Sequence, residues 1–228
     1  MFVVLKRSNI FILAASVMLS VATVNMVKNS PALPASSAVW ENKVIVLDAG
    51  HGGFDGGAVG ISGAVEKEIN LEITLKLKAL LEKTGAKVVV TRQDDTALAE
   101  TKKEDMRKRK EIKESSGADI FVSIHMNKFS QEKYSGAQVF YANDEKSQKL
   151  GEHIQSAMVN LLNPENNRKA KATDGNVYIL KESGVPSVIV ECGFLSNAEE
   201  EGLLKQKDYQ QKVAWSIYSG VLKYFDEG

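Results

Sequence analysis

The sequence has almost no cysteine, little proline and no excess of charge of either sign. Cys192 is the single cysteine among 228 residues, which excludes an internal disulfide and therefore a disulfide-stapled scaffold. Only four residues are proline and 43% are hydrophobic, a composition that argues against a collagen-like or disordered chain. Lysine and arginine total 29, as do aspartate and glutamate, so the composition predicts no nucleic-acid partner.

Nucleotide-binding motifs are also missing. A glycine-rich turn surrounds residue 51, but it lacks the Walker A lysine and the spacing of a dinucleotide-binding loop. The chain shows no internal repeat and no low-complexity tract. Its length predicts one domain with a sizeable core.

The first 38 residues differ from the rest of the chain. Lys6 and Arg7 precede an apolar run over residues 10–27, and small residues with two prolines follow. This order is typical of an export signal, and the run is also long enough for an uncleaved membrane anchor. We therefore predict a signal peptide or anchor with a short linker over 1–38, and one exported domain over 39–228.

Strands and helices alternate along that domain. The expected strands are 43–47, 87–91, 119–124, 137–141, 177–180 and 187–192, and the expected helices are 69–81, 101–116, 145–162 and 209–225. This order predicts an α/β fold: a mostly parallel, twisted sheet with helices on both faces. Ligands of such sheets bind at the carboxyl ends of the strands. The irregular stretch 163–176 is a candidate substrate-contact loop.

Two histidines follow predicted strands and suggest a metal site. His51 lies in the glycine-rich turn, and His125 comes directly after the strand 119–124. Two imidazoles and one carboxylate, with an open fourth position, form a known catalytic zinc set. The candidates for the carboxylate are Glu66, Glu68 and Glu72. Asp48 is either a partner that orients an imidazole or simply a turn former.

Glu191 is unusual because it ends an apolar run that should be buried. A general base mounted on an inner strand would occupy such a position, and burial and a nearby cation would shift its pKa in opposite directions. The neighbouring Cys192 offers an alternative, a cysteine nucleophile with His125 as its base. Adjacent strand residues point to opposite faces, so Glu191 and Cys192 do not share one cleft.

Four ordered motifs carry a resemblance to a known family. They are the segments 46–53 (VLDAGHGG), 66–67 (EK), 123–127 (SIHMN) and 190–197 (VECGFLSN). Together they resemble the zinc-dependent N-acetylmuramoyl-L-alanine amidases of the amidase-3 type, from about residue 44 to the carboxyl terminus. The stretch 174–181 is most similar to the spore-cortex members of that family.

The resemblance implies both a site and a reaction. Zinc would be held by His51, Glu66 and His125, with Glu191 catalytic. The substrate would be peptidoglycan, cleaved at the amide between N-acetylmuramic acid and the L-alanine of the stem peptide. In spore cortex this would be a step to muramic-δ-lactam, in cooperation with a muramic acid deacetylase. An activating lipoprotein is a further candidate partner, and the location would be outside the cytoplasmic membrane or in the spore intermembrane space.

Three other functions are compatible with the same residues. They are a non-catalytic glycan-binding module, a zinc peptidase cutting within the stem peptide, and a zinc-dependent deacetylase of the sugar. An intact metal set disfavours the first, and the products of peptidoglycan digestion distinguish the other two from an amidase.

Overall fold

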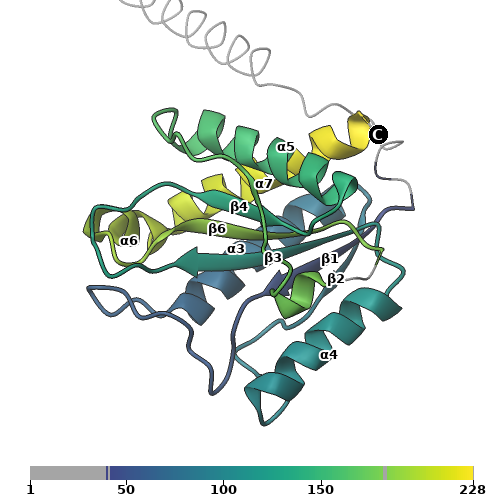
Figure 1. Ribbon diagram of the computed structural model, residues 1–228, viewed down its shortest axis with the longest axis horizontal. Coiled ribbons are helices and arrows are strands. Elements are labelled where there is room, and N and C mark those ends of the chain that lie inside the picture. Colours follow the sequence, from purple (N-terminus) through teal and green to yellow (C-terminus); the bar gives the residue numbers. More distant parts are fainter. Residues whose placement is uncertain (1–39, 41, 182–183, 228) are drawn as a thin grey trace, which may run out of the picture. The chain divides into compact units, whose positions relative to one another are not determined.

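A computed structural model describes residues 40, 42–181 and 184–227, and the predicted export segment over 1–38 lies outside them. A six-stranded sheet with the order β2-β1-β3-β6-β4-β5 forms the centre of the fold (Figure 1). Its strands are β1 (Val44–Ala49), β2 (Lys87–Val90), β3 (Ile120–Asn127), β4 (Gln138–Tyr141), β5 (Lys171–Ala172) and β6 (Ser187–Phe194).

The sheet is mostly parallel, as predicted. β1 pairs in parallel with β2 and β3, and β3 pairs in parallel with β6. Only the contact of β4 with β6 is antiparallel. The carboxyl ends of β1, β3 and β6 therefore meet at one edge of the sheet, where ligands of α/β folds bind.

Helices cover both faces of this sheet, which confirms the predicted fold class (Figure 1). The helices are α3 (Glu66–Lys83), α4 (Lys102–Ser115), α5 (Glu145–Leu162), α6 (Ala198–Leu204) and α7 (Lys207–Asp226), with a 3₁₀ turn η1 (Tyr178–Leu180). Apolar residues of α3, α5 and α7 join one face of the sheet in the main core cluster. A smaller cluster joins the other face to α4 and to the segment around η1.

The segment 177–180 was predicted as a strand, and this prediction is wrong. It forms η1, in which the amide of Leu180 donates to the carbonyl of Val177 and the amide of Lys181 to that of Tyr178. Ile179 and Leu180 are nevertheless buried in the smaller cluster. The apolar run therefore predicted the burial of these residues correctly. It did not predict their secondary structure, because a short apolar run does not distinguish a strand from a helical turn.

Two short elements had no counterpart in the predicted order. β5 has two residues and α6 has seven, so neither carries a measurable hydrophobic period. Asn197 caps the amino end of α6: its side chain accepts hydrogen bonds from the amides of Glu199 and Glu200. Within the described part of the chain, no helix has the length and apolar character needed to cross a membrane.

Candidate metal centre

Three segments bring the candidate ligands to the carboxyl edge of the sheet. His51 follows β1, Glu66 is the first residue of α3, and His125 lies near the end of β3. β3 extends to Asn127, so His125 lies within the strand rather than after it. The backbone of His51 is left-handed, with a φ of 62°, which is uncommon for a residue with a side chain and turns the chain sharply after β1.

The side chains of these residues converge. Nδ1 of His125 lies 2.9 Å from Oε1 of Glu66, and Nε2 of His51 lies 3.2 Å from Oε2 of the same carboxylate. One ligand atom from each of the three residues lies within 4.8 Å of the others, close enough to share one metal ion. Glu68 and Glu72, the other two candidates for the carboxylate, are exposed on α3 and do not belong to this group.

Glu66 is held as a buried carboxylate. The amide of Ala58 donates to Oε2 at 2.8 Å, and the amide of Met126 donates to Oε1 at 3.1 Å. Burial alone would raise the pKa of Glu66, but the hydrogen bonds from His125 and His51 outweigh it and hold the pKa well below its usual range. Glu66 therefore stays ionised, as a metal ligand must.

A carboxylate that sequence reasoning missed orients His51. Nδ1 of His51 donates to Asp55 at 2.9 Å, and Lys102 approaches the same carboxylate at 3.0 Å. Burial would raise the pKa of Asp55, but the hydrogen bonds from His51 and Lys102 lower it to about 2. With Nδ1 engaged, Nε2 of His51 faces Glu66 and the metal position. Such carboxylate–histidine pairs are common around protein-bound zinc.

Asp48, which the sequence suggested as a residue that orients an imidazole, has a different set of partners. It is buried and accepts hydrogen bonds from Thr91, Ser123 and Arg109. The guanidinium of Arg109 in turn donates to the carbonyl oxygen of His51 at 2.6 Å. Asp48 thus supports the backbone that carries His51 and does not contact an imidazole.

Gly50 determines which nitrogen of His125 faces the metal position. A Cβ on Gly50 would lie 2.3 Å from Nε2 and Cε1 of the His125 ring, so the ring packs directly against the bare backbone. Nε2 is blocked by this contact, and Nδ1 is the nitrogen that points at Glu66. Only glycine leaves room for the ring at this position.

Glu191 stands beside this group without belonging to it. It is paired with His125 in the register of β6 and β3, so both side chains leave the same face of the sheet. Its Oε2 atom is buried and has no hydrogen-bond partner among the described residues. Burial, opposed by the charge of His125 and reinforced by that of Glu66, raises the pKa of Glu191 to about 7. A carboxyl group with this pKa can take up and release a proton near neutral pH.

The alternative of a cysteine nucleophile does not fit the structure. Cys192 is buried in the main core cluster, on the face of β6 opposite to Glu191. Burial raises the pKa of its thiol well above the ordinary value, so the reactive thiolate is suppressed.

The donor set fits zinc. Two imidazole nitrogens and one carboxylate oxygen are the ligands of one class of catalytic zinc sites, which keep a fourth position for water or substrate. Asp55 and Gly50 select one nitrogen on each ring, so the three donors are arranged in advance of metal binding.

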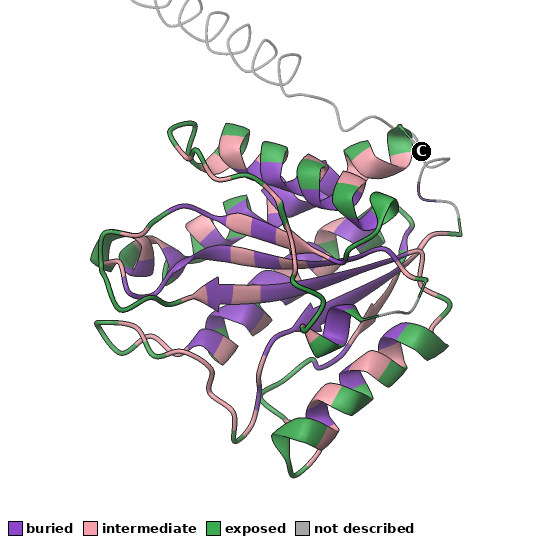
Figure 2. Ribbon diagram, in the orientation of Figure 1, coloured by how far each residue is buried: buried purple, intermediate pink, exposed green. Residues whose placement is uncertain are grey.

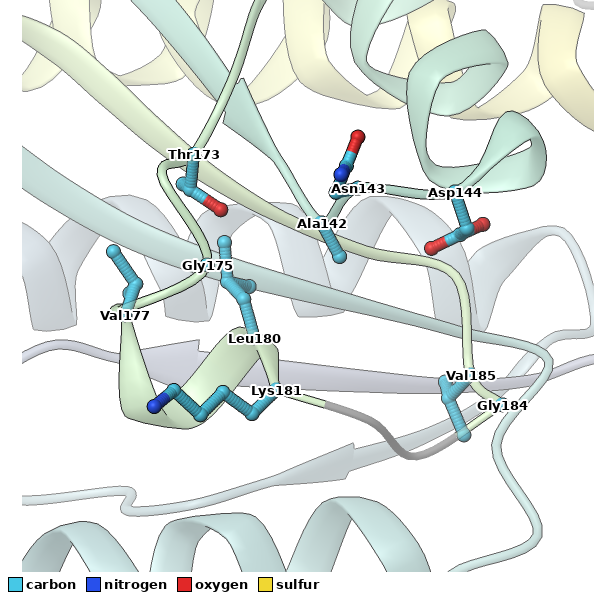
Figure 3. A pocket seen from close by; sticks show the side chains of 10 residues that line it. All are labelled: Ala142, Asn143, Asp144, Thr173, Gly175, Val177, Leu180, Lys181, Gly184 and Val185. Carbon is cyan, nitrogen blue, oxygen red and sulfur yellow. The ribbon is translucent and has the colours of Figure 1, made fainter.

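One hollow among the described residues lies away from the candidate metal centre. It has a volume of about 590 Å³ and is lined by residues after β4 and around η1, including Asn143, Thr173, Leu180 and Lys181 (Figure 3). Ala142, another lining residue, is hydrogen-bonded to Ser187 at the amino end of β6. This hollow therefore faces the end of the sheet opposite to the candidate metal centre and contains none of its residues.

The chain matches known proteins over most of its length. Residues 45–223 match the family described as N-acetylmuramoyl-L-alanine amidase. The germination-specific N-acetylmuramoyl-L-alanine amidase of Bacillus subtilis is 42% identical over 195 residues, which cover 81% of each chain.

Two solved structures are also similar. The CwlD amidase of Clostridioides difficile, solved in complex with the GerS lipoprotein, has 45% identity and a TM-score of 0.79, covering 82% of this chain and 100% of that one. A second N-acetylmuramoyl-L-alanine amidase, from Clostridium difficile 630, has 32% identity and a TM-score of 0.74, covering 81% and 97%.

Proposed function

The chain belongs to the N-acetylmuramoyl-L-alanine amidase family, and from this premise we propose the residues and the metal that perform its reaction. It is an amidase of the cell wall, which cleaves the bond between N-acetylmuramic acid and the L-alanine of the stem peptide. In our proposal His51, Glu66 and His125 hold a zinc ion, and Glu191 carries the proton.

One observation carries this assignment. Two carboxyl groups lie at the same edge of the sheet in opposite states: that of Glu66 is saturated with hydrogen bonds and ionised, whereas Glu191 has an unpartnered oxygen and a pKa of about 7. Pairs of carboxyl groups whose environments separate their pKa values commonly divide the work of a hydrolase. Glu66 is the one suited to a metal, and Glu191 the one suited to a proton.

The steps of the reaction follow from these positions. When bound, zinc polarises a carbonyl group and lowers the pKa of water from ~15.7 to ~7. Glu191 accepts a proton from the water that attacks the lactyl carbonyl carbon. It then returns this proton to the alanine nitrogen, because an amide nitrogen leaves poorly unless it is protonated. Asp55 keeps His51 in one tautomer throughout.

The setting of the reaction is proposed from the relatives. The germination-specific relative suggests that the substrate is spore-cortex peptidoglycan and that the product is an intermediate on the way to muramic-δ-lactam, with a deacetylase completing the conversion. The lipoprotein bound to the C. difficile relative suggests an activating lipoprotein for this chain. Both require a location outside the cytoplasmic membrane, and we retain residues 1–38 as the export signal or anchor.

Analysis of digested muropeptides by mass spectrometry tests the function. The purified protein, supplied with zinc, is expected to release peptides that begin with intact L-alanine and to leave muramic acid without a peptide. A chelator should abolish this release, and added zinc should restore it. Cleavage inside the stem peptide would instead identify a peptidase, and release of acetate a deacetylase.

A further inference from the structure

A row of register partners leads away from the candidate metal centre across the sheet. His125 on β3 is the partner of Glu191 on β6, and Glu191 is the partner of Gln138 on β4. Neighbouring strands are about 4.8 Å apart, so two such steps place Gln138 about 10 Å from His125 along the row.

The face of the sheet along this row is accessible. Val139 and Val190 point into the main core, so Gln138 and Glu191 leave the opposite face. On that face Ile189, Glu191, Gln138 and Phe140 are only partly buried. Figure 2 shows partly buried stretches in pink among the buried, purple stretches of the sheet. We take this face as the one along which a substrate held at the metal centre extends over β6 and β4.

A fixed guanidinium lies at the end of the row. Arg168 donates from Nη1 to the side-chain oxygen of Gln138 at 3.0 Å and from Nε to the carbonyl of Ser135 at 2.7 Å. Its guanidinium also stacks on the ring of Phe194, 4.6 Å from the centroid. The side-chain nitrogen of Gln138 donates to the carbonyl of Lys169, which fixes the orientation of its amide.

The guanidinium is nevertheless not neutralised. Among the described residues no carboxylate forms an ion pair with Arg168, and its Nη2 donates no hydrogen bond. Burial raises the pKa of Glu200, although the hydrogen bonds that it accepts and the charge of Arg168 act against this. The carboxyl group of Glu200 already accepts hydrogen bonds from the amides of Gly136 and Phe194. A half-buried arginine held by neutral acceptors, with a free edge, is suited to bind a carboxylate of a ligand.

We propose that Arg168 forms a carboxylate subsite for the peptide part of the substrate. An extended peptide spans about 3.5 Å per residue, so a distance of about 10 Å corresponds to about three residues. The ligand group is therefore a free carboxylate on the second or third residue of the stem peptide, counted from the alanine at the cleaved bond. This proposal rests on the amidase function described above and assigns a purpose to the loop 163–176.

Matched substrates test the subsite. They are muropeptides with intact stem peptides and variants in which the free carboxylate of the second or of the third stem residue is replaced by a carboxamide. The wild-type protein should cleave the carboxylate form with a kcat/KM on the order of ten- to one hundred-fold higher than at least one carboxamide form. The difference should lie in KM, because the subsite lies away from the reacting atoms.

Three variants separate binding from folding. Arg168→Gln should lose the preference by cleaving the carboxylate form poorly while cleaving the carboxamide form as the wild type does. Arg168→Lys keeps the positive charge but loses the planar guanidinium that binds a carboxylate through two hydrogen bonds, and it should retain part of the preference. Lys169→Gln, with the same change of charge at the adjacent exposed residue, should retain all of it.

The contrary outcomes are distinguishable. A wild-type protein without preference, or an Arg168→Gln variant that keeps the preference or loses activity equally on all substrates, would overturn the subsite and leave the amidase function intact. A wild-type protein loaded with zinc that cleaves none of the substrates would overturn the proposed function together with the subsite.

Discussion

The carboxylate of Asp55 accepts a hydrogen bond from Nδ1 of His51 at 2.9 Å, and this bond leaves Nε2 of the same ring directed at Glu66. The orientation of the imidazole is thus set by a residue only four positions along the chain. The turn between them is made possible by positive φ angles at His51, Gly52 and Gly53.

Asp55→Asn should weaken zinc binding without unfolding the protein. Loss of a carboxylate that orients a ligating histidine typically costs 10- to 100-fold in metal affinity, and we expect a rise of that order in the zinc dissociation constant. Competition with a chromogenic chelator measures it. Asp174→Asn, an exposed residue that bonds only within its own turn, is the control. Equal affinities in both variants would show that Asp55 does not orient His51.

Gly50→Ala should displace His125. The added methyl group would lie 2.3 Å from the imidazole, a distance that no relaxation of the ring within its place can accommodate. We expect loss of stoichiometric zinc, measured by elemental analysis, in a protein that keeps its helical circular dichroism. Gly202→Ala is the control, because a Cβ at that helical position meets nothing within 4 Å. Full zinc content in Gly50→Ala would contradict the assignment of Nδ1 as the ligating atom.

Asp48→Asn should destabilise the fold beneath the site. The substitution removes the charge of one of the two buried carboxylates that pair with Arg109, the other being Asp105, and disturbs the hydrogen bonds from Thr91 and Ser123. Breaking a buried ion pair on one side costs about 3–5 kcal/mol, and denaturant unfolding of the metal-free protein should show a loss of this order. Glu111→Gln, which removes an exposed partner of Arg107, should cost only about 0–1 kcal/mol. Similar losses for the two variants would be inconsistent with this account.

Lys113 should make stability depend on alkaline pH. Its side chain is fully buried, donates to the carbonyl of Ile179 at 2.6 Å and lies over the ring of Phe121. Burial, assisted by the charge of Lys110, lowers its pKa from 10.5 to about 8. The unfolded chain therefore binds this proton more tightly than the folded one between pH 8 and pH 10.5, so the contribution to stability rises over this range.

Lys113→Met should remove that rise. Relative to the variant, the wild type should gain about 3 kcal/mol of unfolding free energy between pH 7.5 and pH 10.5, measured by urea titration at a series of pH values. Lys103→Met, on the exposed side of the same helix, should preserve the dependence. A wild type and a Lys113→Met variant with parallel curves would show that Lys113 is not the titrating group.

Much of this arrangement follows from local patterns in the sequence. Short apolar runs followed by His51, His125 and Glu191 predict strands whose ends meet, because parallel strands of one sheet bring their carboxyl ends to one edge. The choice among Glu66, Glu68 and Glu72 does not follow from such patterns. It depends on where α3 begins and on the amides of Ala58 and Met126, which come from distant segments.

Asp55 and Arg168 were also hard to predict, because their roles depend on backbone turns and on contacts between distant segments. Asp55 reaches His51 only because three successive residues adopt positive φ. The hydrophobic pattern of the sequence does not predict such backbone angles. Arg168 reaches Gln138 across 30 positions of sequence, from a loop whose one regular element is the two-residue strand β5. Side-chain contacts of this kind are set by tertiary packing and are invisible to a reading of local periodicity.

The central claim is that three residues hold the metal while Glu191, unligated, carries the proton. Zinc content and turnover on purified cortex muropeptides, measured together in Glu191→Gln and His51→Ala, test it most directly. The account predicts that Glu191→Gln keeps stoichiometric zinc and loses turnover, and that His51→Ala loses the zinc as well. Near-normal turnover in Glu191→Gln, or full zinc content in His51→Ala, would contradict it.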